Sequence, residues 1–430
     1  MKLKKVALCI PTYNRPDVIE EFIEKYASMY LKHNFDIYIY DSSENKKTES
    51  IVKRWHQCYT RLNYVQVDSE VHSNMKVYNI FKEFGDSLEY DYLWVCSDSI
   101  RWTQKVLDSI DSAVNQGYDI IIPNYRDVEK IGNRVYKDAN ALFLDCAWHM
   151  TLYGATILKV SSMLNGIDWE ILKEKYAVPE CINHSHVAFY FEKLCNMQNW
   201  KALHISCSDN DLIASGLKKY PGWQKDTFYV WCHCWPAMIN KLPEYYKNKK
   251  KVIKKSGVNS YILSYSNFII LRSENILNIE VYRQYKREWR NLTNVVSLVI
   301  WLLAIFPPKY VVYLKGSKAF MYLIKELLLK RKIKKYCRKF NKVYIYGAGK
   351  KAKVYTKYLD EMGLEFEGYL VSSLLDNATV MENHKVFMFS KELLNDKKIG
   401  ILMALNKENT KDVLQNVLSN VKRNKLFINY

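Results

Sequence analysis

Short apolar runs alternate with amphipathic stretches over roughly the first hundred residues. The apolar runs predict four strands, at KKVALCIPTY (4–13), FDIYIYD (35–41), LNYVQVD (62–68) and YDYLWVCSDS (90–99). The amphipathic stretches predict helices over 17–31, 48–55 and 74–84. Strands interleaved with helices are typical of βαβ units, so we expect an α/β domain with a mostly parallel sheet.

Polar residues directly follow each of these strands. They are Pro11-Thr12-Tyr13, Asp41-Ser42-Ser43, Asp68-Ser69-Glu70 and Ser97-Asp98-Ser99. Ligands of open parallel sheets bind beyond the carboxyl ends of the strands, so the sequence predicts a binding site built from these turns.

The remaining pattern predicts two further parts. Residues 116–235 are mixed, 243–290 are helical in pattern, and 295–306 are almost wholly apolar before Pro307-Pro308. A basic helical pattern over 315–340 precedes a new strand, turn and helix that start at 342. Because 430 residues exceed one ordinary core, we predict three regions, 1–240, 241–340 and 341–430.

Composition excludes several classes of protein. A chain with 49% hydrophobic and 14% aromatic residues is not disordered, and 14 glycines with 9 prolines exclude a collagen-like repeat. The ten cysteines form no Cys-x-x-Cys pair, which favours reduced thiols in a cytosol, and Cys232-His233-Cys234 makes a poor zinc site. The first residues lack a signal-peptide pattern, so we expect a cytoplasmic protein.

The positive charge is concentrated. Residues 241–255 carry seven lysines against Glu244, and residues 315–342 carry eleven basic residues against Glu326, out of a net charge of +19. The apolar run 295–306 between them is ~18 Å long as a helix, short of the ~30 Å hydrocarbon core of a bilayer. We therefore expect an interfacial helix at an anionic membrane surface, with a buried inter-domain helix as the alternative.

The motif CIPTYNRP (9–16), the strand-end Asp41 and the Ser97-Asp98-Ser99 turn together resemble family 2 glycosyltransferases, which have the GT-A fold. The resemblance covers about residues 4–235. It implies that the nucleotide is lined by Pro11, Thr12, Tyr13 and Arg15, with Asp41 on the base. It also implies that Asp98 faces the diphosphate and a divalent metal, Mn²⁺ or Mg²⁺. This chain has one carboxylate where the family motif has two.

Other residues of the predicted site follow from their chemistry and position. Arg15 and Lys76 are suited to donate charge-assisted hydrogen bonds to the phosphates. Ser43, Ser97 and Ser99 lie in the same strand-end turns. The catalytic base stays open between Glu180, His186 and Asp145, and the pattern places Asp145 at an apolar strand end just before Gly154. His233 is either a late metal ligand or a histidine of an aromatic cluster, and nearby rings that could stack on sugars are Trp223, Phe228, Tyr229, Trp231 and Trp235.

The resemblance implies an inverting transfer of a sugar from a nucleoside-diphosphate sugar, expected to be UDP-linked. The expected acceptor is a lipid-linked or polymeric glycan of capsule or teichoic acid, at the inner face of a bacterial plasma membrane. Two alternatives remain: a nucleic-acid-binding protein using the basic stretches, and an NAD-dependent oxidoreductase using YIYGAGKKA (344–352). We expect neither, because nucleic-acid binding does not explain the strand-end aspartates. The dinucleotide motif lacks an acidic residue at 368–372, and Asp376 lies beyond that segment. The sequence predicts no oligomeric state.

Overall fold

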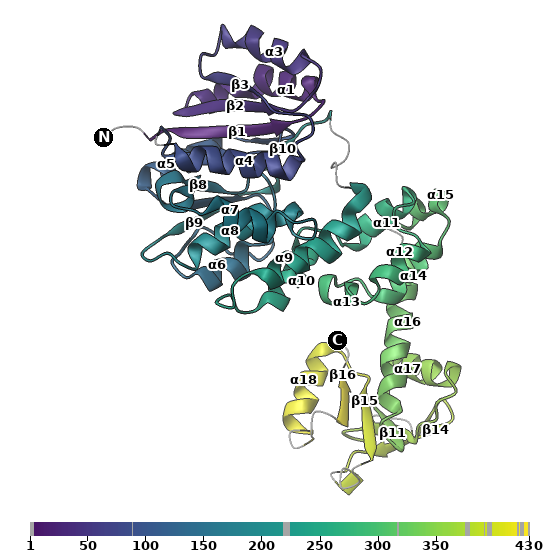
Figure 1. Cartoon of the computed structure of the whole chain (residues 1–430). Coiled ribbons are helices and arrows are strands. Elements are labelled where there is room, and N and C mark those ends of the chain that lie inside the picture. Colours follow the sequence, from purple (N-terminus) through teal and green to yellow (C-terminus); the bar gives the residue numbers. More distant parts are fainter. Residues whose placement is uncertain are drawn as a thin grey trace. The chain divides into compact units, whose positions relative to one another are not determined.

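The computed structural model of the chain forms two compact units, residues 1–312 and 313–430 (Figure 1). It describes residues 4–87, 89–217, 224–315, 318–374, 379–390, 392–393, 398–418, 421 and 425–428. Trp223 and Asp376 lie outside these ranges. The segment 241–312 belongs to the first unit.

An eight-stranded sheet forms the centre of the first unit, in the order β3-β2-β1-β4-β8-β6-β9-β7. Its strands are β1 (Val6–Thr12), β2 (Phe35–Asp41), β3 (Leu62–Gln66), β4 (Tyr92–Val95), β6 (Ile120–Asn124), β7 (Arg134–Tyr136), β8 (Ile157–Lys159) and β9 (Ala202–Ser206). Strands β3, β2, β1 and β4 are parallel neighbours, and β6 is parallel to β9. β8 runs antiparallel between β4 and β6, and β7 closes the edge antiparallel to β9.

The sequence of the central strands explains their position. Val6 to Ile10 of β1 are all buried, as expected for a strand covered on both faces. Figure 1 shows α1 (Pro16–Phe22) and α3 (Lys47–His56) beside β1, β2 and β3. The helix predicted over 17–31 is present, but it passes through a π-helical turn at Ile23–Ala27 before α2 (Ser28–Leu31). α4 (Ser73–Asp86) packs against β1 and β4, while α5 (Gln104–Gln116) packs against β6.

Shorter elements complete this sheet unit. A two-stranded ribbon pairs β5 (Ile100–Trp102) with β10 (Leu212–Ala214). The helices between the strands are α6 (Ala139–Cys146), α7 (Trp169–Tyr176) and α8 (Ser185–Leu194). A short 3-10 turn covers Ile182–His184, and a π-helical turn covers Tyr229–Cys234.

Residues 235–311 of the first unit are mostly helical. They contain α9 (Trp235–Lys241), α10 (Lys249–Asn259), α11 (Tyr265–Ser273), α12 (Ile279–Tyr285), α13 (Trp289–Leu292), α14 (Ser297–Ile305) and α15 (Pro308–Val311). α10 contacts α6, α9 and α13. Gly257 allows this packing, because a Cβ there would lie 1.9 Å from the Leu292 carbonyl oxygen. Among the described residues, no helix is both long and apolar enough to span a bilayer.

The second unit is a smaller α/β domain with the strand order β13-β14-β12-β11-β15-β16. Its strands are β11 (Lys342–Tyr346), β12 (Gly368–Val371), β13 (Val380–Met381), β14 (His384–Met388), β15 (Ile399–Met403) and β16 (Leu426–Ile428). All neighbours are parallel except β13 and β14. Its helices are α16 (Lys318–Cys337), α17 (Lys350–Glu361) and α18 (Lys407–Asn416).

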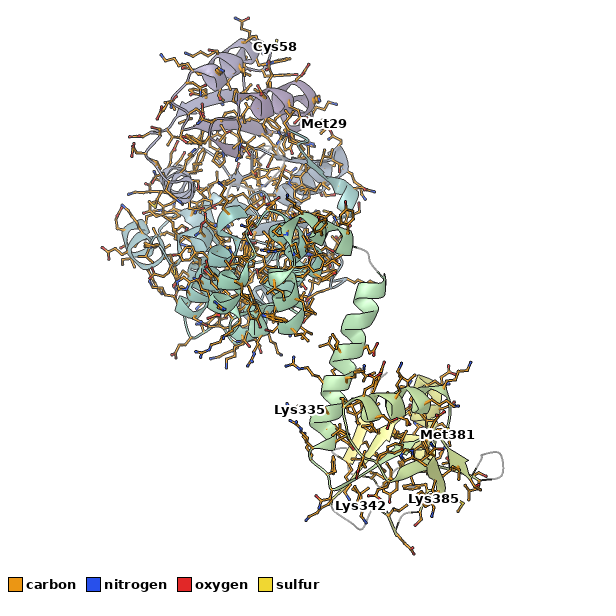
Figure 2. The ribbon with its side chains drawn as sticks, turned by 90° about the vertical axis from the view of Figure 1, so that its right-hand side faces the viewer. Met29, Cys58, Lys335, Lys342, Met381 and Lys385 are labelled. Atoms are coloured by element: carbon orange, nitrogen blue, oxygen red, sulfur yellow. The ribbon has the colours of Figure 1, made fainter. Side chains whose placement is uncertain are left out.

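The fold class predicted from the sequence is confirmed in both units, each of which has a mostly parallel sheet with helices between its strands. The Gly347-Ala348-Gly349 turn joins β11 to α17, as its motif predicts, and Gly347 has a positive φ of 104°. In the second unit Lys335 and Lys342 are exposed and point away from the domain core (Figure 2).

Candidate active site

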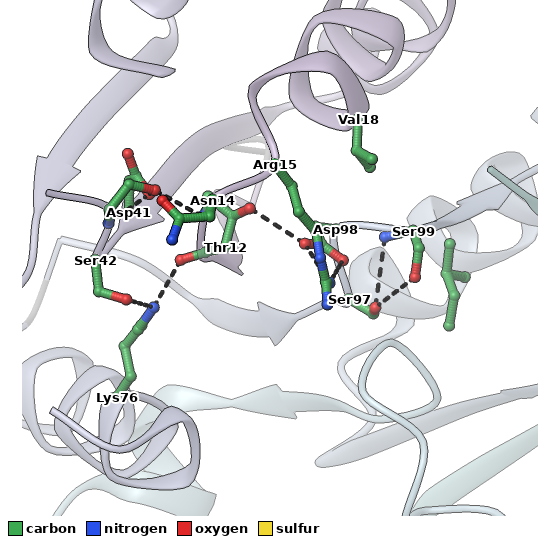
Figure 3. A network of polar contacts seen from close by, with 12 residues as sticks. Thr12, Asn14, Arg15, Val18, Asp41, Ser42, Lys76, Ser97, Asp98 and Ser99 are labelled. Atoms are coloured by element: carbon green, nitrogen blue, oxygen red, sulfur yellow. Dashed lines mark hydrogen bonds and ion pairs between the residues drawn. The ribbon is translucent and has the colours of Figure 1, made fainter. Parts of the chain in front are cut away.

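Three strand ends meet at one edge of the larger sheet. β2, β1 and β4 are adjacent and parallel, so the turns after Thr12, Asp41 and Val95 lie side by side. Figure 3 shows the polar side chains of these turns joined in one network. The topology therefore brings together the turns that the sequence marks as a binding site.

Asp98 is the buried carboxylate of this network, with only 3% of its surface exposed. Its Oδ2 accepts a hydrogen bond from the Thr12 hydroxyl at 3.1 Å. One Arg15 nitrogen, Nη1, lies 3.0 Å from Oδ1 and 2.9 Å from Oδ2. Arg15 precedes α1 as its N-cap residue, so the first helix positions the cation that holds Asp98.

Arg101 holds the Ser97-Asp98-Ser99 turn through its backbone. It is 1% exposed, and its Nη1 donates to the Asp98 carbonyl oxygen at 2.6 Å, while Nη2 donates to the Val18 carbonyl oxygen at 3.1 Å. Its guanidinium also lies 4.7 Å from the Phe22 ring centre. The sequence analysis missed this positioning residue, although a single arginine between Ile100 and Trp102 was a visible signal.

Asp41 ties the first two strand ends together. It is fully buried, and its Oδ1 accepts from the Ser43 amide at 3.0 Å and the Ser43 hydroxyl at 2.5 Å. The Ser43 oxygen in turn accepts from the Asn14 amide at 2.8 Å. Asn14 has a positive φ of 52°, a conformation that asparagine tolerates better than most residues. The Asn of the PTYNR motif therefore shapes the turn that carries Arg15.

Lys76 reaches the network from α4. Its Nζ donates to the Thr12 carbonyl oxygen at 2.7 Å and to the Ser42 hydroxyl at 2.6 Å (Figure 3). Burial lowers the pKa of Lys76 to about 8, although Asp41 and Asp98 favour its charged form. Lys76 and Arg15 thus place two cationic groups beside two carboxylates at the same sheet edge.

The other residues predicted around the nucleotide lie at the same edge. Pro11 is half-buried at the end of β1, and Tyr13 is 51% exposed. The hydroxyls of Ser97 and Ser99 lie 3.1 Å apart on either side of Asp98. Tyr13 is therefore accessible to solvent at this edge of the sheet.

Two candidate bases lie near the 3-10 turn before α8. Glu180 is half-buried just ahead of that turn. His186 is 2% exposed, and burial lowers its pKa to about 4. Its ring lies 4.6 Å from the ring centre of Tyr153, whose carbonyl oxygen accepts from the Ser97 amide. His186 is therefore linked to the Asp98 turn by one intervening residue.

The surroundings of Asp145 differ from those that the sequence suggested. We expected an apolar strand end, but the residue is on α6, because Asp138 caps a helix that starts at Ala139. Its carboxylate accepts from the Tyr136 hydroxyl at 3.0 Å and pairs with Arg134 at 3.3 Å and Lys255 at 3.5 Å. These partners account for the Asp145 charge.

His233 lies on the π-helical turn with an exposed side chain. Its ring stacks on Tyr229, with the ring centres 5.3 Å apart. The neighbouring Cys232 and Cys234 are buried, and burial raises the pKa of both thiols. In the part of the chain that the structure describes, no three His, Cys, Asp or Glu residues are grouped to hold a metal.

The donor set around Asp98 is nonetheless compatible with a divalent ion. A buried carboxylate with serine and threonine hydroxyls nearby offers oxygen ligands of the kind that Mg²⁺ and Mn²⁺ prefer. One protein carboxylate is enough for an ion that takes its other ligands from a diphosphate and water. The residues therefore fit such an ion only together with its anionic substrate.

Comparison with known families finds a match within the first unit. The model of glycosyl transferase family 2 matches residues 7–73, which include the PTYNR turn, Asp41 and Ser43. This stretch of the chain is similar to family 2 glycosyltransferases. The resemblance drawn from the sequence is thereby confirmed, and so is the prediction of a nucleotide-sugar-dependent glycosyltransferase. No curated protein matches the chain.

Solved structures with a similar arrangement include three glycosyltransferase-type enzymes. A Pyrobaculum calidifontis mannosyltransferase, in complex with GDP-Man and Mn²⁺, is 13% identical, covering 70% of this chain and 87% of its own, with a TM-score of 0.38. Staphylococcus aureus TarS 1–349 with UDP is 13% identical, covering 73% and 92%, with a TM-score of 0.39. Mycobacterium tuberculosis glucosyl-3-phosphoglycerate synthase with Mn²⁺ and UDP is 10% identical, covering 56% and 81%, with a TM-score of 0.37.

Proposed function

We propose that this enzyme transfers a sugar from a nucleoside-diphosphate sugar, UDP-linked, to a glycan acceptor. The observation that carries the proposal is the network at one sheet edge. Two cations, Arg15 and Lys76, lie there with two buried carboxylates, Asp41 and Asp98. A donor of this class needs hydrogen-bond acceptors for its base and positive charge for its diphosphate.

In this proposal the base lies beside Asp41 and the diphosphate lies beside Arg15 and Lys76. The leaving diphosphate gains negative charge as the sugar bond breaks, so cations fixed in advance stabilise the transition state more than the ground state. When bound, a divalent ion adds further positive charge on the diphosphate, and Asp98 is the residue that would hold it. Arg101 keeps the Asp98 turn in place through the Asp98 carbonyl oxygen.

Glu180 is our proposed base for an inverting transfer. Of the three candidates, Asp145 is paired with Arg134 and Lys255, and His186 is almost fully buried. A histidine with a pKa of about 4 is also a weak base at neutral pH. Glu180 is half-buried and ion-pairs with no described residue, so its carboxylate is available to take a proton from an acceptor hydroxyl.

We further propose that the acceptor is lipid-linked or polymeric, as in capsule or teichoic-acid synthesis, and that the enzyme acts at the inner face of a bacterial plasma membrane. In support, α14 exposes Trp301 and Ile305, one helical turn apart, while its opposite face is buried. The lysine-rich segment 241–255 belongs to the same unit. Apolar and basic groups together are what stable peripheral binding requires.

The test is a panel of UDP-, GDP- and other nucleotide sugars, assayed by thermal unfolding of the full chain with and without Mn²⁺. A ligand present at about 100 times its Kd stabilises the folded state by about 2.7 kcal/mol, so the correct donor should raise the unfolding temperature clearly. Transfer is then measured as nucleotide release. We expect UDP sugars to stabilise the protein and Asp41→Ala to reduce that effect.

Ser109→Ala on α5 serves as the control, since among the described residues its hydroxyl bonds only to the Lys105 carbonyl oxygen of the same helix. It should respond to the donor as the wild type does. If no nucleotide sugar stabilises the protein, but DNA or RNA binds with a steep salt dependence, the proposed function is wrong.

A further inference from the structure

A cavity opens at the same edge of the larger sheet as the proposed donor site, beyond β6 and β9. Its volume is about 630 Å³, and its wall includes Tyr125 and Arg126 after β6, Ser206 at the end of β9, and Tyr261 after α10. All of these residues belong to the first unit. The cavity is thus lined by the ends of two strands and by Tyr261 of the helical segment.

The position of the cavity relates it to Asp98. β6 lies two strands from β4 and β9 lies three, which at ~4.8 Å per strand gives about 10–14 Å. β6 and β9 run parallel to β4, because β8 is antiparallel to both β4 and β6. The Tyr125 ring also lies 6.5 Å from that of Trp102, on the strand that follows the Asp98 turn. The part of an acceptor that binds in this cavity would therefore be several bonds away from its reacting hydroxyl group.

Arg126 is the organising residue of the cavity wall. Its guanidinium carbon lies 5.1 Å from the Tyr125 ring centre and 4.9 Å from the Tyr261 ring centre. Its Nη1 donates to the Ser260 carbonyl oxygen at 3.1 Å. These contacts fix the plane of the guanidinium, while within the described ranges Arg126 makes no ion pair with a carboxylate. The remaining N–H groups are available for an anion, and an arginine held in advance loses less entropy on binding it.

The other charged groups of the cavity decide what kind of anion it suits. Asp127 is engaged by the Ile131 and Gly132 amides, both at 2.8 Å, and by the Ser206 hydroxyl at 2.9 Å, which lower its pKa. Lys130 is exposed and pairs with no described carboxylate. Asp209 is exposed and also lines the cavity. The cavity wall therefore combines two cations, one carboxylate that can accept hydroxyl hydrogens, and two tyrosine rings.

We infer that this cavity is an acceptor subsite for a sugar unit that carries an anionic group, a phosphate or a carboxylate. Arg126 and Lys130 bind the anionic group, Asp209 accepts from sugar hydroxyls, and the tyrosine rings contact the apolar faces of the sugar. The inference rests on the proposed function and adds to it the charge class of the acceptor. A neutral sugar would leave Arg126 without a counterion and should bind more weakly.

The experiment compares three matched sugars on the full chain by NMR or calorimetric titration: glucose 6-phosphate, glucuronate and glucose. We expect one or both charged sugars to bind and glucose to bind at least about 10-fold more weakly. Arg126→Gln should weaken the charged sugar by about 10- to 100-fold, the usual loss for a hydrogen bond to a charged group. Which charged sugar binds separates a phosphate-bearing acceptor from one that carries a carboxylate.

Matched variants separate binding from folding. Arg283→Gln, at an exposed position of α12, should bind like the wild type. Tyr261→Phe keeps the ring over Arg126 and should also bind, whereas Tyr261→Ala should weaken binding. If Tyr261→Ala or Arg126→Gln unfolds the protein, Arg126→Lys takes its place in the comparison. Lysine keeps the positive charge but loses the planar guanidinium, so it should weaken binding of the charged sugar by a smaller factor.

Two outcomes would overturn the inference. UDP binding, measured in parallel, shows whether the proposed transferase function fails as well. If UDP binds but neither charged sugar binds better than glucose, the subsite is wrong and the donor site stands. If Arg126→Gln binds the charged sugars as tightly as wild type, the subsite is likewise wrong. If charged sugars bind through Arg126 while no nucleotide does, the anion site stands and the transferase proposal fails.

Discussion

Asp98 is the residue on which we expect catalysis to depend most under the proposed function. Asp98→Asn keeps the size of the side chain and an oxygen for Thr12 and Arg15, but it removes the negative charge. We expect turnover to fall by about 100-fold or more, the usual loss when one preorganised group at a developing charge is removed, with little change in unfolding temperature. Donor-dependent nucleotide release with and without Mn²⁺ measures the effect.

The matching control is Asp108→Asn, an exposed carboxylate on α5 that interacts with His33 and Gln104. It should retain normal turnover. Near-normal turnover in Asp98→Asn would instead show that Asp98 only holds its turn.

Lys76 makes activity depend on pH near its lowered pKa. Under the proposed function its charged form binds the diphosphate. Because its pKa is about 8, kcat/KM for the donor should fall as the pH rises through about 8. Lys76→Arg should move this loss to much higher pH, because arginine stays protonated. A pH profile of kcat/KM on both proteins checks this, and an unchanged descending limb in Lys76→Arg would assign it to another group.

The same pKa shift has a consequence for stability. Between pH 8 and 10.5 the unfolded chain keeps a proton on Lys76 that the folded chain has lost. The unfolded state then binds more protons, so this residue's contribution to the free energy of unfolding increases with pH over that interval. Lys76→Met should remove that increase in urea unfolding measured at pH 7 and pH 10.

At the scale of elements, Gly154 sets the spacing between the Asp98 turn and the loop before β8. It has a φ of +104°, and a Cβ there would lie 2.8 Å from the Cys96 sulfur. Its carbonyl oxygen accepts from the Trp94 indole at 3.0 Å. Gly154→Ala should lower the free energy of unfolding by about 1–3 kcal/mol and also reduce turnover, because it displaces the strand that carries Asp98.

Gly166→Ala is the matched control. Gly166 also has a positive φ, +68°, but a Cβ there meets no atom within 4 Å. It should destabilise the protein without a change in turnover per folded molecule. Equal losses in both variants, measured by denaturant unfolding and nucleotide release, would contradict a specific role for Gly154.

At the scale of the whole molecule, charge and exposed apolar groups predict attachment to a membrane surface. The two basic segments, 241–255 and 315–342, hold most of the net charge of +19. The protein should sediment with anionic vesicles at low salt and be partly released at high salt, since the Debye length falls to ~3 Å at 1 M. Replacing the exposed Trp301 and Ile305 by serine should release it further.

Ile300→Ser distinguishes the surface of α14 from its core. Ile300 is fully buried, so this change should destabilise the fold, whereas the Trp301 and Ile305 pair should leave unfolding unchanged. If the exposed pair unfolds the protein instead, α14 belongs to an internal core and the membrane proposal is wrong. Equal sedimentation with neutral vesicles would exclude the electrostatic part.

The local sequence pattern was sufficient to predict the helices and strands, but not the environment of each side chain. Burial on both faces makes a parallel strand nearly continuous in apolar residues, so Val6–Ile10 was recognisable from sequence. Asp145 was misplaced because a short apolar helix and a strand end look alike without periodicity. Trp301 and Val299 look equally apolar in sequence, yet one is exposed and the other buried.

The sequence by itself determined the strand–helix alternation, the turns with Thr12, Asp41 and Asp98, and the resemblance to family 2 glycosyltransferases, because each depends on residues close together in the chain. Tertiary structure decided which of those turns touch. Arg15 and Asp98 are 83 positions apart, and only the adjacency of β1 and β4 brings them to hydrogen-bond distance. The cavity around Arg126 depends likewise on Ser260, 134 positions away. Contacts between distant segments follow from strand order and helix packing, which local patterns do not specify.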